Sequence, residues 1–193
     1  MRRGLWPQGG LWRHADFLKL WSAQSVSQLG TQISAIALPL VALYELHATA
    51  FEVAALGTVE FLPFLLFTLP AGVWVDRLRR RWLMVTADLG RVVALGSIPL
   101  AAALGHLTLA QLYIAGFVTG TLTVFFDVSY QSYLPSLVER EQLVDGNAKL
   151  EVTRATAQVA GPGLGGLLVR ALTAPYAVLA DALSYLWSAG FLF

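Results

Sequence analysis

The sequence contains no cysteine, and charged residues make up only 13% of its 193 residues. Disulfides and thiolate metal sites are therefore excluded. The three histidines lack the spacing of a metal site, and the net charge of +1 gives no reason to expect a nucleic-acid partner. No phosphate-binding loop and no Ser-His-Asp grouping is recognisable, so we expect neither an enzyme nor a cofactor, and no catalytic or metal-binding residue.

Apolar residues are abundant and form 56% of the chain. A soluble domain of this length could not bury so much apolar surface, so a lipid bilayer is the expected solvent. The pattern predicts an all-α integral membrane protein, in which a polar cytoplasmic segment, 1–16, precedes a six-helix bundle, 17–193. The predicted spans are residues 17–43, 51–75, 82–104, 109–130, 155–172 and 175–193.

Lys and Arg gather at alternate ends of these spans. Basic residues beside membrane helices are retained on the cytoplasmic side, so both ends of the six-helix unit are predicted to be cytoplasmic. We also expect Pro135 to end the fourth helix, and the polar segment 135–147 to form a surface loop with a short helix.

The most basic segment is Gly72 to Arg81, which reads Gly-Val-Trp-Val-Asp-Arg-Leu-Arg-Arg-Arg. It holds four of the thirteen basic residues. Gly72 lies one helical turn before Asp76, and a glycine lets another backbone approach closely. Either the segment only sets the topology through its charge, or its spacing has a more specific role.

This spacing resembles the signature loop between helices two and three of the major facilitator superfamily, Gly-x-Leu-Ala-Asp-Arg-x-Gly-Arg-Lys. The matching residues are Gly72, Asp76, Arg77, Arg80 and Arg81. Arg79 replaces the family's glycine. The resemblance implies that the loop holds the two halves of a transporter together on the cytoplasmic side. It also implies that Asp127, near the end of the fourth helix, forms an ion pair with Arg80 or Arg77.

A second resemblance lies in the fifth span, which contains Gly161-Pro-Gly-Leu-Gly-Gly166. The exporter-associated motif of the same superfamily has the core Gly-Pro-x-x-Gly-Gly, matched here by Gly161, Pro162, Gly165 and Gly166. Ala157 and Ala148 stand where the fuller motif has two more glycines. The resemblance to exporters is therefore partial.

The segment 125–135, Phe-Phe-Asp-Val-Ser-Tyr-Gln-Ser-Tyr-Leu-Pro, looks like the macrolide-efflux and enterobactin-export branch of the superfamily. Three spans followed by three of opposite topology would be the inverted-repeat plan of each half of such a transporter. The resemblance covers the whole chain but only half of a usual transporter. It implies the amino-terminal half, with a second six-helix half as its partner.

Polar residues inside the spans are candidates for the transport site. Gln24, Gln28 and Gln32 recur every four residues, and we expect them to line a water-filled cavity or to bond to a neighbouring helix. Glu60 and Asp181 are the acids that lie well inside predicted spans and away from the cytoplasmic ends. Each is either a proton-coupling site or a structural partner of another helix.

The predicted function is a proton-coupled exporter of small molecules, of drug or siderophore type, in the cell membrane. It would work by alternating access, with the lipid bilayer, the substrate, protons and the second half as partners. The alternative is a membrane scaffold or assembly subunit that transports nothing.

Overall fold

A computed structural model describes residues 11–193, which form six long α-helices and two short 3-10 turns, at Leu11–Arg13 and Arg140–Gln142. The helices are α1 (Ala15–Glu45), α2 (Ala50–Val75), α3 (Arg80–Ala103), α4 (Leu109–Leu137), α5 (Leu143–Leu172) and α6 (Ala174–Leu192). The described residues contain no strand, so the predicted all-α class is confirmed. Most of the predicted segment 1–16 lies outside the described residues.

Helices α1 to α4 are long and apolar enough to cross a membrane, judged by length and composition. The chain is thus a multi-pass membrane protein. Helices α5 and α6 fall outside this group: Gln158, Arg170 and several glycines interrupt the apolar part of α5, and α6 carries Asp181 within only 19 residues. The spans predicted for 155–172 and 175–193 stay a prediction.

The structure corrects two predicted helix ends. Pro135 does not end α4, which continues to Leu137. The backbone N–H that a proline lacks falls in the last turn of the helix here, so its absence removes few intrahelical hydrogen bonds. Helix α5 begins at Leu143 rather than in the apolar run. Ion pairs one turn apart, such as that of Lys149 with Asp145, stabilise this charged extension of the helix.

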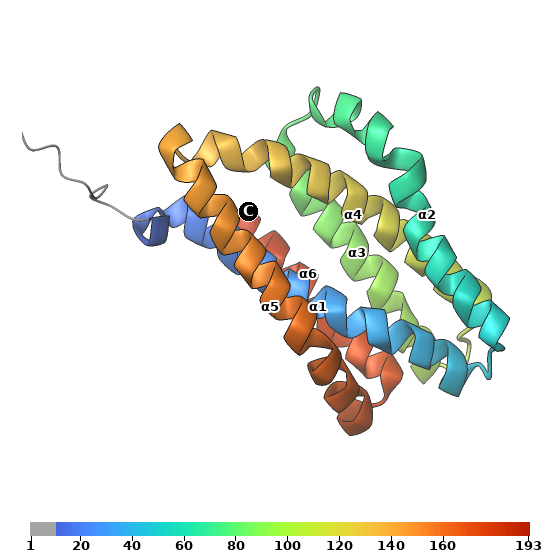
Figure 1. Cartoon of the computed structure of the whole chain (residues 1–193). Helices are drawn as coiled ribbons and strands as arrows, with labels where there is room; N and C mark the ends of the chain where they lie inside the picture. The colour runs from blue at the N-terminus through green and yellow to red at the C-terminus, as the bar shows by residue number, and fades with distance from the viewer. Residues whose placement is uncertain (1–10) are drawn as a thin grey trace, which may run out of the picture.

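The helices form two groups of three (Figure 1). In one group α1 packs against α5 and α6, and in the other α4 packs against α2 and α3. The groups are joined chiefly where α3 packs against α6. This arrangement places α1 and α4 centrally and leaves α2 and α5 at the two flanks of one face.

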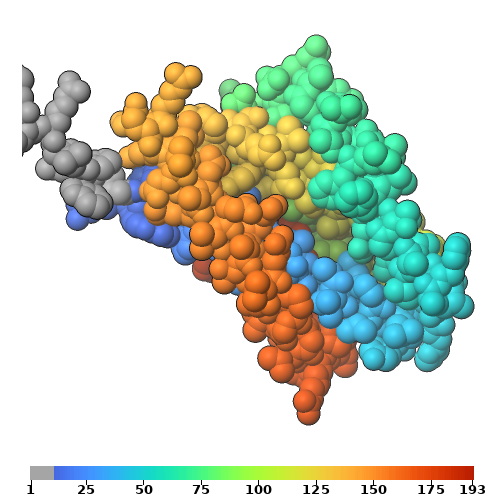
Figure 2. All heavy atoms as spheres, viewed as in Figure 1, coloured from blue at the N-terminus to red at the C-terminus, as the bar shows by residue number. Residues whose placement is uncertain are grey.

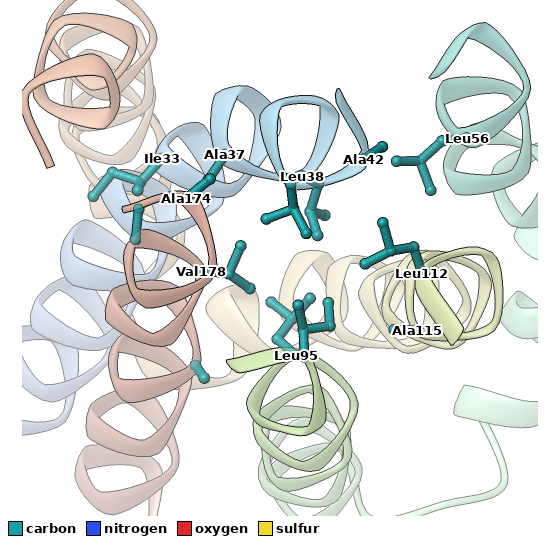
Figure 3. Packing of buried hydrophobic residues seen from close by; sticks show 14 of the residues in the cluster. Ile33, Ala37, Leu38, Ala42, Leu56, Leu95, Leu112, Ala115, Ala174 and Val178 are labelled. Atoms are coloured by element: carbon teal, nitrogen blue, oxygen red, sulfur yellow. The ribbon is translucent and has the colours of Figure 1, made fainter. Parts of the chain in front are cut away.

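Two apolar clusters lie at opposite ends of the bundle. Figure 3 shows the first, where side chains of α1, α2, α3, α4 and α6 meet, including Leu38, Leu56, Leu95, Leu112 and Val178. The second joins the start of α1 to α3 and α4 and to the end of α6; its members include Phe17, Leu20, Met84, Phe126 and Leu192. Between these clusters lies a layer of buried polar and charged side chains.

Glycines allow the closest helix approaches. A Cβ at Gly161 of α5 would overlap the side chain of Gln32, and one at Gly165 would lie 3.3 Å from the Cα of Ile33. On the other side, a Cβ at Gly120 of α4 would lie 2.5 Å from the carbonyl oxygen of Glu60. The backbones of α1 and α5, and of α2 and α4, therefore meet where side chains are absent.

The two faces of α5 make this packing testable. Gly161→Ala is expected to destabilise the protein by about 1–3 kcal/mol, because the new methyl group overlaps Gln32. A Cβ at Gly163 meets no atom within 4 Å, so Gly163→Ala should be neutral, or stabilising by up to about 1 kcal/mol through helix propensity. Thermal unfolding of the full-length protein in detergent measures both. Equal effects of the two substitutions would contradict the packing described.

Candidate functional site

Two cavities lie between α1 and α4. The first, of about 250 Å³, is polar and is lined by Gln24 and Gln28 of α1, Asp127 and Gln131 of α4, and the charged start of α5. The second, of about 160 Å³, is more apolar; its lining includes Thr31 and Leu38 of α1, Thr119 and Thr123 of α4, and residues of α2, α3 and α6.

The two cavities follow one another along the same faces of both helices. On α1 the lining positions are 24, 28, 31, 34, 35 and 38, and on α4 they are 116, 119, 120, 123, 127, 130 and 131. At about 100° per residue, each set stays within about 60° of one line along its helix. We call this surface the α1–α4 groove. Figure 2 shows the face of the molecule hollowed between α5 and α2.

The three glutamines predicted as one stripe separate in the structure. Gln24 and Gln28 line the first cavity. Gln32 packs against Gly161 of α5 instead, because a spacing of four residues advances about 40° around the helix at each step. The cavity interpretation therefore suits Gln24 and Gln28, and helix packing suits Gln32. Thr31 continues the groove stripe in its place.

The two candidate coupling acids line the same cavity. Glu60 comes from α2 and Asp181 from α6, and both border the second cavity. The Oε1 atom of Glu60 is buried and has no hydrogen-bond partner within the described residues. Asp181 is 1% exposed and accepts a hydrogen bond from the Ser184 hydroxyl at 3.1 Å. Sequence separation gave no sign that these carboxylates share one site.

Asp88 and Arg91, three residues apart on α3, form an ion pair. Both side chains are almost fully buried, at 0% and 3% exposure. The Arg91 guanidinium lies 4.0 Å from the centre of the Tyr185 ring and 4.5 Å from that of Phe126. Sequence reasoning thus missed Arg91 as a site residue. An arginine well inside an apolar span is itself a sign of a functional site, and it could have been used to find Arg91.

Tyr185 connects this charge pair with the groove. Its ring covers Arg91, and its hydroxyl lies 2.8 Å from the Thr31 hydroxyl on α1. Arg91 also donates to Thr123 of α4 at 3.4 Å. Groove-lining residues of both central helices therefore contact the buried charge layer.

The basic segment lies at one end of the bundle. Asp76 caps α2, is 71% exposed, and lies 3.7 Å from Arg80. Arg80 also donates to the Ser132 carbonyl of α4 at 2.9 Å, and Arg81 donates to the Leu192 carbonyl at the end of α6. A Cβ at Gly72 would meet no atom within 4 Å, so its face is open to another helix. Arg77 is exposed.

Asp127 does not join the basic segment. Within residues 11–193 it forms no ion pair with Arg77 or Arg80. It lines the first cavity together with Arg154 of α5, because it lies on the α4 face that turns toward α1 and α5. The predicted ion pair is therefore absent from this structure, and Asp127 is a groove residue.

The fifth-helix motif divides by helix face. Gly161 and Gly165 contact α1, whereas a Cβ at Gly166 would meet no atom within 4 Å, and Pro162 is exposed. Among residues 11–193, no group of three His, Asp or Glu side chains could hold a metal ion.

Comparison with known proteins identifies the family. A family model described as transmembrane secretion effector matches residues 10–192. The MFS-type transporter YfiS of Bacillus subtilis is 23% identical over 91% of this chain and 41% of its own length. The chain belongs to the major facilitator superfamily. Membership places it among transporters rather than enzymes.

Other relatives of this facilitator-superfamily chain have names that refer to efflux. Macrolide efflux protein A of Streptococcus pyogenes is 26% identical over 79% of the chain and 37% of its own length. The multidrug efflux pump Tap of Mycolicibacterium fortuitum is 27% identical over 83% of the chain and 40% of its own length. The resemblance to macrolide-efflux proteins is thus confirmed. The chain spans about 40% of the length of these relatives, and no solved structure matches it.

Cysteine substitution can test which residues line the groove, because this chain has no cysteine of its own. In an otherwise cysteine-free full-length protein, Gln28→Cys should react quickly with a small water-soluble thiol reagent, since position 28 lines the first cavity. Gln32→Cys should react at least tenfold more slowly, since position 32 packs on Gly161. Mass spectrometry of the labelled protein gives both rates. Equal rates would contradict the groove as defined.

Proposed function

We propose that this chain is the amino-terminal half of a proton-coupled exporter of small molecules that works by alternating access. The observation that carries the proposal is the second cavity, which is bordered by two carboxylates from different helices: Asp181 is buried, and Glu60 has its Oε1 atom buried. Intramembrane acids are costly, and they mark ion and proton pathways. A scaffold subunit would need neither a hollow groove nor a buried carboxylate oxygen without a partner.

Helix packing supports the predicted 3+3 inverted repeat. If α1, α2 and α3 correspond to α4, α5 and α6, the pair α1–α6 corresponds to α4–α3, and the pair α1–α5 to α4–α2. All four pairs pack closely, and the α3–α6 pair would lie on the symmetry axis. Substrate sites of such transporters lie near the middle of the membrane, where the repeats meet. The α1–α4 groove occupies the corresponding place in this fold.

The groove supports export of small molecules that combine apolar and polar groups. Its second cavity is mostly apolar, with Leu38, Phe64 and Leu95 in its lining, beside threonine hydroxyls and two carboxylates. The efflux names of two relatives and the partial fifth-helix motif favour export.

The second half would cover the groove from the face flanked by α2 and α5. Both helices expose many large apolar side chains, including Leu65, Leu69 and Trp74 on α2 and Val152 and Val159 on α5. Gly72 leaves room beside the basic segment for a helix of the other half. In this proposal the segment helps to hold the halves together on the cytoplasmic side of the cell membrane.

The test of coupling uses the full-length protein in vesicles with an imposed proton gradient. Glu60→Gln and Asp181→Asn should each reduce uphill efflux at least tenfold, because an amide cannot take up and release the proton. Downhill exchange of substrate, which needs no net proton movement, should change far less. Asp16→Asn, an exposed acid on the same chain, is the matched control. Uphill efflux with unchanged pH dependence in both variants would rule out these two coupling sites.

The orientation has its own test. Single cysteines at Arg79 and Glu141 should react with a membrane-impermeant thiol reagent only after the cells are opened, because basic segments stay in the cytoplasm. Cysteines at His47 and His106, in the loops at the other end of the helices, should react in intact cells. All four positions are exposed. The reverse labelling pattern would show that the assigned orientation is wrong.

A further inference from the structure

The buried charge layer behind the groove contains an unequal number of acids and bases. We call it the α3–α6 seam and define it by Asp88 and Arg91 of α3 and by Asp181, Ser184, Tyr185 and Ser188 of α6. All six are buried, with exposures of 0–6%. Apolar clusters close the bundle on either side of the seam. It therefore has little contact with water.

The charges of the seam balance only if one of its two acids carries a proton. Two carboxylates and one guanidinium would leave a net charge of −1 if both acids were ionised. A buried charge without a partner costs several kcal/mol, and such a group becomes neutral instead. Arg91 pairs with Asp88, so the unpaired acid is Asp181. The charge count therefore predicts that the proton lies on Asp181 while Arg91 is paired with Asp88.

Other groups around Asp181 do not change this count. On the α1 side, Gly30 packs so closely that a Cβ there would overlap Asp181 and Ser184, and Ser34 lines the same cavity as Asp181. Glu60 of α2 borders this cavity and Asp127 of α4 borders the other one, but both are only half-buried and lie outside the buried seam. On α3, the charged groups of the seam are Asp88 and Arg91.

The carboxylate of Asp88 has an oxygen atom that is free to accept the proton. The Oδ2 atom of Asp88 is buried and has no hydrogen-bond partner within the described chain, and the same holds for Nε of Arg91 and for the Ser188 hydroxyl. On α6 the Ser184 hydroxyl bonds to Asp181, and Ser188 lies one turn farther along the same helix, buried like Asp88. Hydroxyls and bound water between two acids provide a path for a proton.

We propose that the α3–α6 seam holds one exchangeable proton, and that Arg91 determines its position by pairing with Asp88 or with Asp181. When Arg91 moves to Asp181, the O–H bond of Asp181 breaks and one forms at Oδ2 of Asp88. The net charge of the seam stays constant. This inference deepens the proposed coupling role of Asp181 and adds Asp88 and Arg91 as positioning residues on the side of the site away from the substrate.

Infrared spectroscopy of purified full-length protein at neutral pH, without substrate, tests the proton count directly. The wild-type protein should show a carboxylic-acid C=O band that disappears in Asp181→Asn. Asp88→Asn should also lose this band, because Arg91 then neutralises Asp181. The double variant Asp88→Asn with Arg91→Met should regain it, because the net charge is again −1. Asp16→Asn should leave it unchanged.

A purely structural role for Asp88 gives a different result. The carboxylic-acid band would then persist in Asp88→Asn, and this outcome would overturn the proposal. Absence of the band from the wild-type protein would also overturn it. If Asp88→Asn does not fold, Arg91→Met alone serves, since two acids without a base should both be protonated and the band should about double. An unchanged band in Arg91→Met would equally overturn the proposal.

This measurement separates the seam from the transport function. In one outcome, the band changes among the variants as the charge count predicts while efflux does not depend on the proton gradient. This result would support the seam proton and refute proton coupling. Proton-driven efflux without an Asp181 band would refute the seam and leave Glu60 as the carrier.

Discussion

The arginine buried inside an apolar bundle is the constraint on which much of this structure depends. Arg91 cannot stay charged among lipid-facing helices unless its charge is balanced and its guanidinium is enclosed. Asp88 supplies the charge, the rings of Tyr185 and Phe126 cover the planar group, and Thr123 accepts a hydrogen bond. Because these partners come from α3, α4 and α6, satisfying one side chain fixes how three helices are placed.

The groove depends on a second constraint, the unequal closeness of helix pairs. Glycines bring α5 onto α1 and α2 onto α4, and the strongest packing across the middle is between α3 and α6 at the rear. Helices α1 and α4 are thereby held by neighbours on their outer sides while contacting each other little. The space between them can remain open without loss of packing, since the two apolar clusters and the α3–α6 contact hold the halves of the bundle.

Sequence reasoning found the elements well and their rotations poorly. Apolar runs and basic loops located all six helices, because length and hydropathy are local properties. The first residue of α5, Leu143, could not be located from hydropathy, because a charged helix in water has no apolar run to mark it. The contacts of Gln32, Asp127 and Arg91 depend on which face of each helix turns inward. The packing of segments far apart in the sequence determines these helix rotations. The shared cavity of Glu60 and Asp181 could not be inferred for the same reason.

Tyr185 is one of the side chains that link the groove to the seam. Its hydroxyl bonds to Thr31 in the groove wall, and its ring lies over Arg91 in the seam. The ring is almost fully buried and packed on both sides, so it cannot shift at one contact without shifting at the other. A molecule in the second cavity that moved α1 relative to α6 would therefore change the cover of Arg91, and with it the balance between Asp88 and Asp181. Substrate and proton could then influence each other through this connection as well as through the cavity that Asp181 lines.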